Sequence, residues 1–141
     1  MSPYNPDWDR DLAFGEAQEV EVEGILSAIR NGGLTYEVKS DRYLNGHWYL
    51  EWEQRPVGRD HWKPSGIQTT KADLWVVRFP EPVDALEVWR TSRLRLVAKS
   101  GRLGRLRDGG KFGDNPTRGW VVTGPQIANY LRVLDQQAAA V

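Results

Sequence analysis

An acid, a base and a second acid alternate along one short stretch of the chain, at Glu37, Lys39 and Asp41. If residues 34–41 form a β-strand, these three side chains share one face, because successive side chains of a strand point to opposite faces. A carboxylate can bind a hard divalent cation, and a lysine on the same face can orient water or hold a phosphate. Such groups can catalyse metal-assisted hydrolysis of a phosphodiester, but charged pairs on a strand face are usually solvated or paired across strands, so the spacing needs support from other residues.

A second strand with carboxylates is expected over residues 47–55, after the Asn45–Gly46 pair that is typical of a tight turn. It contains Glu51 and Glu53. We expect this strand to pair antiparallel with the strand over residues 34–41, so that the carboxylates of the two strands face each other.

The two halves of the chain have opposite charge. Nineteen Lys and Arg residues balance nineteen Asp and Glu residues overall, but residues 1–60 hold 12 acids against 6 bases and residues 61–141 hold 7 acids against 13 bases. The formal charges of the halves are therefore −6 and +6. An acidic half could hold a metal ion and a basic half a phosphate, as a metal-dependent nuclease requires, although a surface of internal salt bridges would give the same counts.

Composition limits the kind of site. The chain has no cysteine, which excludes disulfides, thiol nucleophiles and zinc–thiolate centres and fits a reducing cytosol. Two histidines, His47 and His61, do not favour a histidine-built metal centre, so we expect any metal ion to be bound by oxygen.

A single soluble domain is expected, because 141 residues match the usual size of one domain. No apolar run approaches the length of a membrane span, and the N-terminus has neither the charged start nor the apolar core of a signal peptide. We therefore expect a cytoplasmic protein without a membrane partner.

The N-terminal part is expected to be helical after an irregular lead-in over residues 1–10, where Pro3 and Pro6 disfavour helix. The helix should end at Asn31–Gly32–Gly33, because glycine commonly follows the last helical turn. Its predicted buried stripe consists of Phe14, Val22, Ile25, Leu26 and Ile29. The alternation over residues 20–23 would also fit a strand, but we prefer the helix.

The remainder of the chain alternates strands and helices. The predicted order is strand 74–79, strand 85–90, a helix from Thr91 to Gly101 that buries Leu94, Val97 and Ala98, a flexible basic loop over 101–119, strand 120–123, a helix from Pro125 to Leu134 and a tail over 135–141.

Five basic side chains lie among the glycines of the predicted loop: Arg102, Arg105, Arg107, Lys111 and Arg118. Such a segment can follow a DNA phosphate backbone without reading base sequence, and its binding would weaken with salt. A solvated basic loop is the alternative. The tryptophans that could form a base-stacking surface are Trp48, Trp52 and Trp62.

The order of these elements, and the residues in them, resemble the PD-(D/E)XK or restriction-endonuclease-like nuclease superfamily, in particular small phage and microbial members related to Holliday junction resolvases. The resemblance covers most of residues 12–123. It rests on these segments: Phe14–Gly15 with Glu19, Glu37–Val38–Lys39–Ser40–Asp41, Tyr49–Leu50–Glu51, Ser65–Gly66–Ile67, Thr69–Thr70–Lys71–Ala72–Asp73–Leu74–Trp75, Gly113–Asp114–Asn115 and Gly119–Trp120–Val121–Val122.

The resemblance implies one domain over residues 1–141 with a restriction-endonuclease-like core of the α/β (α+β) class, in which helices flank a mixed central sheet. It implies a Mg²⁺- or Mn²⁺-dependent deoxyribonuclease without a nucleotide cofactor. Glu37 would be the acidic metal ligand, Lys39 the base that orients the attacking water or stabilises the phosphate, and Glu19 the helix carboxylate that some members add. DNA is the implied partner, and a homodimer would reach both strands.

One element of the family pattern is missing. The superfamily normally has an Asp on the strand before Glu-x-Lys, and residues 20–36 contain none. Glu23 could substitute for it, or Asp41 and Glu51 could complete the metal site, or the site could be incomplete. The second explanation is slightly favoured, because Asp41 shares a strand face with Glu37 and Glu51 lies on the strand expected to pair with it.

Two functions follow. The first is a metal-dependent DNA endonuclease acting on branched or otherwise structured DNA, in the host cytoplasm if the protein is encoded by a phage. The second is a catalytically inactive nuclease-fold protein that serves as a DNA- or protein-binding accessory. A purely structural domain, binding neither metal nor DNA, is a third alternative.

Overall fold

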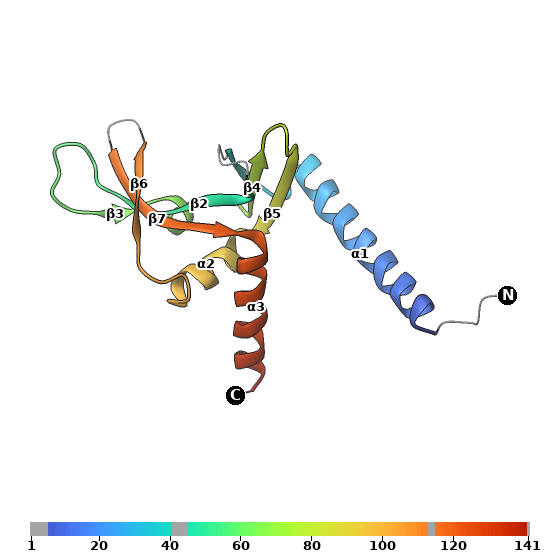
Figure 1. The fold of residues 1–141 in the computed structure, drawn as a ribbon. Helices are drawn as coiled ribbons and strands as arrows, with labels where there is room; N and C mark the ends of the chain where they lie inside the picture. The colour runs from blue at the N-terminus through green and yellow to red at the C-terminus, as the bar shows by residue number, and fades with distance from the viewer. Residues whose placement is uncertain (1–5, 41–44, 113–114, 141) are drawn as a thin grey trace. The chain divides into compact units, whose positions relative to one another are not determined.

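A computed structural model describes residues 6–40, 45–112 and 115–140 (Figure 1). These residues form three α-helices, one short 3₁₀ helix and seven strands, so the predicted mixed α and β class is confirmed. The chain divides into two compact units, Met1–Thr35 and Tyr36–Val141.

The first unit contains helix α1 (Pro6–Arg30). The helix ends as predicted, because Gly32 has a φ of 76° and the Gly33 N–H donates to Ala28 O at 2.7 Å. Its start differs from the prediction, since residues 6–10 are helical and not irregular. Proline is favoured in a first helical turn, where its missing N–H would have no helical partner in any case.

The first unit by itself does not bury the apolar side chains predicted for the stripe of α1. Phe14, Val22 and Leu26 are 67%, 53% and 50% exposed, while Ile25 and Ile29 are half-buried. In the part of the first unit that the structure describes, α1 is the only regular element, so nothing within that unit can cover these side chains. The apolar spacing identified a helix correctly but did not predict its burial.

Across the described ranges, no helix combines the length and the apolar composition needed to cross a membrane.

The second unit contains two β-sheets (Figure 1). Its strands are β1 (Tyr36–Ser40), β2 (His47–Gln54), β3 (Lys63–Pro64), β4 (Leu74–Phe79), β5 (Ala85–Arg90), β6 (Arg107–Phe112) and β7 (Asn115–Thr123). Sheet A has the order β1–β4–β5, with β1 parallel to β4 and β4 antiparallel to β5. Sheet B has the order β3–β2–β7–β6 and is antiparallel. The sequence predicts one central sheet, and the described strands form two.

The predicted antiparallel pairing of the strands over residues 34–41 and 47–55 is wrong. β1 pairs with β4, whereas β2 pairs with β3 and β7. The β2–β7 pairing brings together two sets of buried side chains: Trp48 with Val122, and Leu50 with Trp120. These large apolar side chains leave water only if β2 and β7 are neighbours, and β1, which alternates charged and apolar residues, offers no comparable partner.

The core of the second unit takes side chains from both sheets, from α2 (Thr91–Lys99) and from α3 (Gly124–Ala139). The α2 residues in the core are those predicted, Leu94, Val97 and Ala98. Trp48, a candidate for the surface, is instead 1% exposed in this core.

Two segments predicted as irregular are regular. Residues 135–139 belong to α3 and are not a tail, because their small and polar side chains are compatible with helix. Most of the predicted basic loop is the β6–β7 hairpin. In β6, Gly109 lies so close to the Tyr49 ring that a Cβ atom would not fit. This glycine therefore allows close packing within the sheet, although it was expected to lie in a loop.

A 3₁₀ turn, η1 (Gly66–Gln68), joins β3 to β4 and packs against β2. Gly66 has a φ of +56°, and a Cβ atom there would lie 2.7 Å from the Cβ of Glu51. Ile67 is fully buried. Only glycine satisfies both the backbone angle and the space at residue 66.

We expect Gly66→Ala to lower the free energy of unfolding by about 2–5 kcal/mol, the sum of a left-handed backbone penalty and an overpacking penalty. Chemical denaturation measures the loss. The control is Gly58→Ala, because Gly58 has a φ of +74° but no atom within 4 Å of its Cβ position, so it should cost only the backbone term of about 1–2 kcal/mol. Equal losses at the two positions would contradict the contact with Glu51.

Candidate active site

The Glu-x-Lys motif lies on β1, with both charged side chains on the inward face of sheet A. Glu37 and Lys39 are half-buried, and the residues that alternate with them are exposed, so the predicted alternation is confirmed. In register, Glu37 lies beside Trp75 and Lys39 beside Val77, and both of these β4 residues are fully buried. The two charged groups therefore lie at the border of the core.

Glu37 is held by two donors. Lys39 Nζ lies 3.1 Å from Glu37 Oε1, and Thr70 Oγ1 donates to Glu37 Oε2 at 2.6 Å. Lys39 Nζ also lies 5.2 Å from the centroid of the Trp75 ring, which is within cation–π range. Because 36% of the Glu37 side chain and 42% of the Lys39 side chain are exposed, a ligand can reach both groups from solvent.

These contacts keep Glu37 ionised. Burial by itself would raise the pKa of the Glu37 carboxyl, but the hydrogen bonds from Thr70 and Lys39, together with the positive charge of Lys39, outweigh it and lower the pKa below that of an ordinary glutamate. A carboxylate must be ionised to bind a metal ion. Glu37 therefore meets this condition throughout the neutral range.

Thr70 is positioned by contacts of residues 66–70, a segment that consists of η1 and the two residues after it. Arg95 of α2 donates to two carbonyl groups of this segment, one of which is that of Thr70. At the start of the segment Gly66 packs against Glu51, and Gly66 O accepts from the Thr70 N–H at 3.0 Å. A single short segment thus contacts the backbone of Glu51 on β2 and the carboxylate of Glu37 on β1.

Sequence reasoning did not identify the roles of Thr70 and Arg95. Thr70 belongs to a segment on which the family resemblance rests, but it meets Glu37 across 33 residues of chain. Arg95 reaches Thr70 across 25 residues, and nothing in its local spacing on α2 distinguishes it from the neighbouring arginine, Arg93.

Glu51 lies on sheet B, in different surroundings from Glu37. Burial raises the pKa of the Tyr49 phenol, its hydrogen bond to Thr117 at 3.1 Å lowers it, and the negative charges of Glu51 and Asp108 raise it further, so the net shift is upward. Glu51 is therefore close enough to Tyr49 for its charge to act on the phenol.

Two of the other predicted acids lie outside the described part of the second unit. Glu19 is exposed on α1, in the first unit, and Asp41 lies outside the described residues. No group of three or more His, Asp or Glu side chains is arranged to hold a metal ion in the part of the chain that is described. Mg²⁺ often takes only one or two protein carboxylates together with substrate phosphate and water, and an ionised, half-exposed Glu37 fits that kind of donor set.

The predicted DNA-binding residues have different environments. Arg105 and Arg107 are exposed and Arg102 is half-buried, at the entry to β6. Lys111 lies within β6. Arg118, on β7, is half-buried and forms an ion pair with Glu53 at 2.6 Å, so its charge is already compensated. Arg105 and Arg107 are thus better placed for a phosphate than Arg102 and Arg118.

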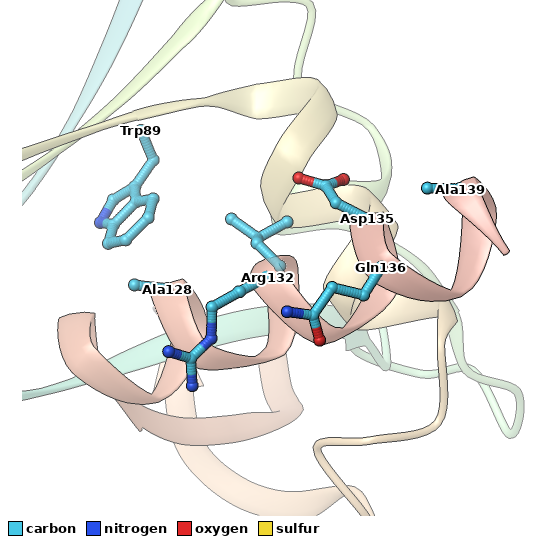
Figure 2. A pocket seen from close by; sticks show the side chains of 7 residues that line it. Trp89, Ala128, Arg132, Asp135, Gln136 and Ala139 are labelled. Atoms are coloured by element: carbon cyan, nitrogen blue, oxygen red, sulfur yellow. The ribbon is translucent and has the colours of Figure 1, made fainter.

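An open hollow of about 590 Å³ lies at the opposite edge of sheet A from Glu37, between Trp89 and α3 (Figure 2). The side chains that α3 contributes are Ala128, Leu131, Arg132, Asp135, Gln136 and Ala139. Asp135 is paired with Arg93 at 2.6 Å. No predicted site residue lines this hollow, so it is not part of the Glu37 site.

We expect Thr70→Val to raise the pKa of Glu37, because the shorter of its two hydrogen bonds is removed while the shape of the side chain is kept. Carboxyl ¹³C NMR titration measures the shift. Thr69→Val is the matched control, since Thr69 makes its contact with Gly66 O and not with Glu37. A lowered folded-state pKa stabilises the fold above the unfolded-chain pKa and stops doing so as the pH falls through the folded value. Thr70→Val should therefore reduce stability near neutral pH more than in acid, and an unchanged Glu37 pKa would contradict the assignment.

Comparisons with protein families, with curated proteins and with solved structures found no match to this chain. Its relation to a nuclease family therefore stands as a proposal that depends on its own residues, above all on Glu37 and Lys39 and on the basic residues of the second unit.

Proposed function

We propose that the chain is a metal-dependent DNA endonuclease in which Glu37 and Lys39 act together on a phosphodiester. The observation that carries the proposal is the contact of an ionised carboxylate with a lysine ammonium, 3.1 Å apart and open to solvent at the border of the core. A half-exposed ion pair of this kind contributes well under about 1 kcal/mol to stability. Stability alone therefore gives little reason to place two charges beside a buried tryptophan.

Lys39 has the N–H donors that the reaction requires. Its ammonium group has three N–H donors, of which Glu37 takes one. The others can orient the attacking water or bind a phosphate oxygen. Thr70 and Lys39 together hold the Glu37 carboxylate in one orientation, which lowers the cost of binding a ligand there.

Glu37 would hold Mg²⁺ or Mn²⁺, with Asp41 and Glu51 as the candidates for a second carboxylate, and the cation would supply positive charge to the phosphate under attack.

Two further features support DNA as the substrate and a restriction-endonuclease-like core as the fold. Tyr36–Val141 contains 17 Lys and Arg residues against 12 Asp and Glu residues, a net charge of +5, and Arg105 and Arg107 are exposed. The Glu-x-Lys strand belongs to a mixed sheet, as the PD-(D/E)XK resemblance implies.

We expect Lys39→Ala to reduce Mg²⁺- or Mn²⁺-dependent cleavage of plasmid DNA and of a synthetic four-way junction by at least about a hundredfold, the usual contribution of a group that orients or transfers a proton. Folding and DNA binding in chelator should be nearly unchanged. The matched control is Lys99→Ala, which removes an exposed lysine from the end of α2. Full cleavage by purified Lys39→Ala would exclude Lys39 from the reaction.

A second candidate function is a catalytically inactive nuclease-fold protein that binds DNA as an accessory. One observation favours it: among the described residues, the contacts of the Glu37 carboxylate are with Lys39 and Thr70 and include no second carboxylate.

Calorimetric titration with Mn²⁺ separates the two candidates. If the endonuclease proposal is right, the wild-type chain should bind Mn²⁺ and Glu37→Gln should lose that binding, because the amide keeps the shape but not the charge. Glu81→Gln, at an exposed acid between β4 and β5, should bind as the wild type does. Absence of Mn²⁺ binding by the wild type, with a salt-sensitive gel shift retained, would support the accessory protein.

A further inference from the structure

Trp62 lies directly before β3, which is an edge strand of sheet B. The sheet has one row of paired residues at this place, Pro64 on β3, Glu53 on β2, Arg118 on β7 and Asp108 on β6. Arg107 directly precedes Asp108 on β6. Figure 1 shows β3 and the β6–β7 hairpin at the same end of the sheet. Trp62 thus lies at the β3 edge of sheet B, while Arg107 lies on β6 at the opposite edge, with β2 and β7 between them.

Arg118 supports the Trp62 ring from one side. Its Cζ lies 3.8 Å from the ring centroid, which is stacking distance, and its guanidinium is held by Glu53 Oε1 at 2.6 Å. The charge of Arg118 is compensated by Glu53, so its contribution here is to hold the indole in place.

Arg55 contacts the same ring more loosely. Its Cζ lies 5.6 Å from the Trp62 centroid, and the residue is exposed. Across the described residues, no acid is paired with Arg55 at salt-bridge distance. Arg55 is therefore able to turn to a phosphate at small cost, whereas Arg118 is not.

The loop between β2 and β3 that contains both Arg55 and Trp62 is anchored to β7. The Val57 N–H donates to Asn115 Oδ1 at 2.9 Å, the Arg55 N–H donates to Pro116 O at 2.9 Å, and Asn115 Nδ2 donates to Gln54 Oε1 at 3.2 Å. An aromatic ring on an anchored loop loses little conformational entropy when a ligand stacks on it.

The charge around the ring favours a polyanion. Residues 55–63 contain Arg55, Arg59 and Lys63 against Asp60, a net charge of +2, and all four are exposed. A half-exposed aromatic ring beside unpaired cations is the arrangement with which proteins hold single-stranded nucleic acid, because any base can stack and the phosphates follow the cations.

We propose that Trp62 is a stacking platform for an unpaired DNA base, with Arg55 binding the adjacent phosphate. The inference deepens the proposed endonuclease function, on which it rests, by naming the substrate class as DNA with unstacked bases, such as single strands and branch points. In intact duplex the bases are stacked on one another, and Trp62 would have no partner.

Fluorescence anisotropy with labelled oligothymidylate and with a duplex of equal length tests the proposal, in chelator so that no cleavage occurs. Trp62→Ala should weaken binding of the single strand by at least about fivefold and leave duplex affinity unchanged, because stacking on one aromatic side chain contributes this much or more per base. Trp62→Phe should restore most of the single-strand affinity, since it keeps an aromatic face. Both variants retain Arg55, Arg105 and Arg107, so unchanged duplex binding also shows that the variant is folded.

Two control variants sharpen the result. Tyr36→Ala removes a 55% exposed aromatic side chain from sheet A and should change neither affinity. Arg107→Ala should weaken single-strand and duplex binding alike, because it removes a charge and no stacking surface.

Equal losses of affinity for both DNAs in Trp62→Ala, or no loss for either, would overturn the proposal. Tighter binding of the matching RNA oligonucleotide would overturn the assignment to DNA. If the wild type cuts no DNA with Mg²⁺ or Mn²⁺ while Trp62→Ala loses only single-strand affinity, the endonuclease proposal fails and the stacking platform stands.

Discussion

The close packing of Gly66 against Glu51 is the constraint on which the second unit depends. It places η1 directly on β2, so that Ile67 enters the core and the following residues run towards β1. Arg95 then holds two carbonyl groups of the segment, and Thr70 reaches the Glu37 carboxylate. The turn that begins at Gly66 therefore connects sheet B with sheet A. The orientation and the ionisation of Glu37 are consequences of this packing as much as of its own strand.

Charge is used in two different ways in the second unit. Arg118 is compensated by Glu53 and lies against an indole ring, so it supports structure. Arg105, Arg107 and Arg55 are exposed, and their charges can be neutralised by a ligand. Glu37 and Lys39 combine both situations, because they neutralise each other and still face solvent. A cation or a phosphate could replace either partner at modest cost, since the pair itself contributes little to stability.

Local patterns predicted the elements better than their partners. The strands over residues 74–79 and 85–90 were predicted to the residue, and so was the buried face of α2, because strand alternation and helix periodicity are properties of short segments. The pairing of β2 depended instead on residues about 70 positions away on β7, where Val122 and Trp120 complete its buried face. The β6–β7 hairpin resembled a loop because glycines usually mark irregular structure, whereas here Gly109 accommodates the Tyr49 ring and Gly119 the backbone of Leu50.

The sequence by itself determined that Glu37 and Lys39 share a face, that the chain divides into an acidic and a basic part, and that arginines gather before β7. Backbone stereochemistry and composition are sufficient for each of these. Only the tertiary structure decided that Thr70 is the second donor to Glu37, that Gly109 packs against the Tyr49 ring, and that Arg118 supports Trp62. These contacts join segments tens of residues apart. Which segments meet is set by the burial of large apolar side chains in a common core, and that burial depends on residues from distant parts of the sequence.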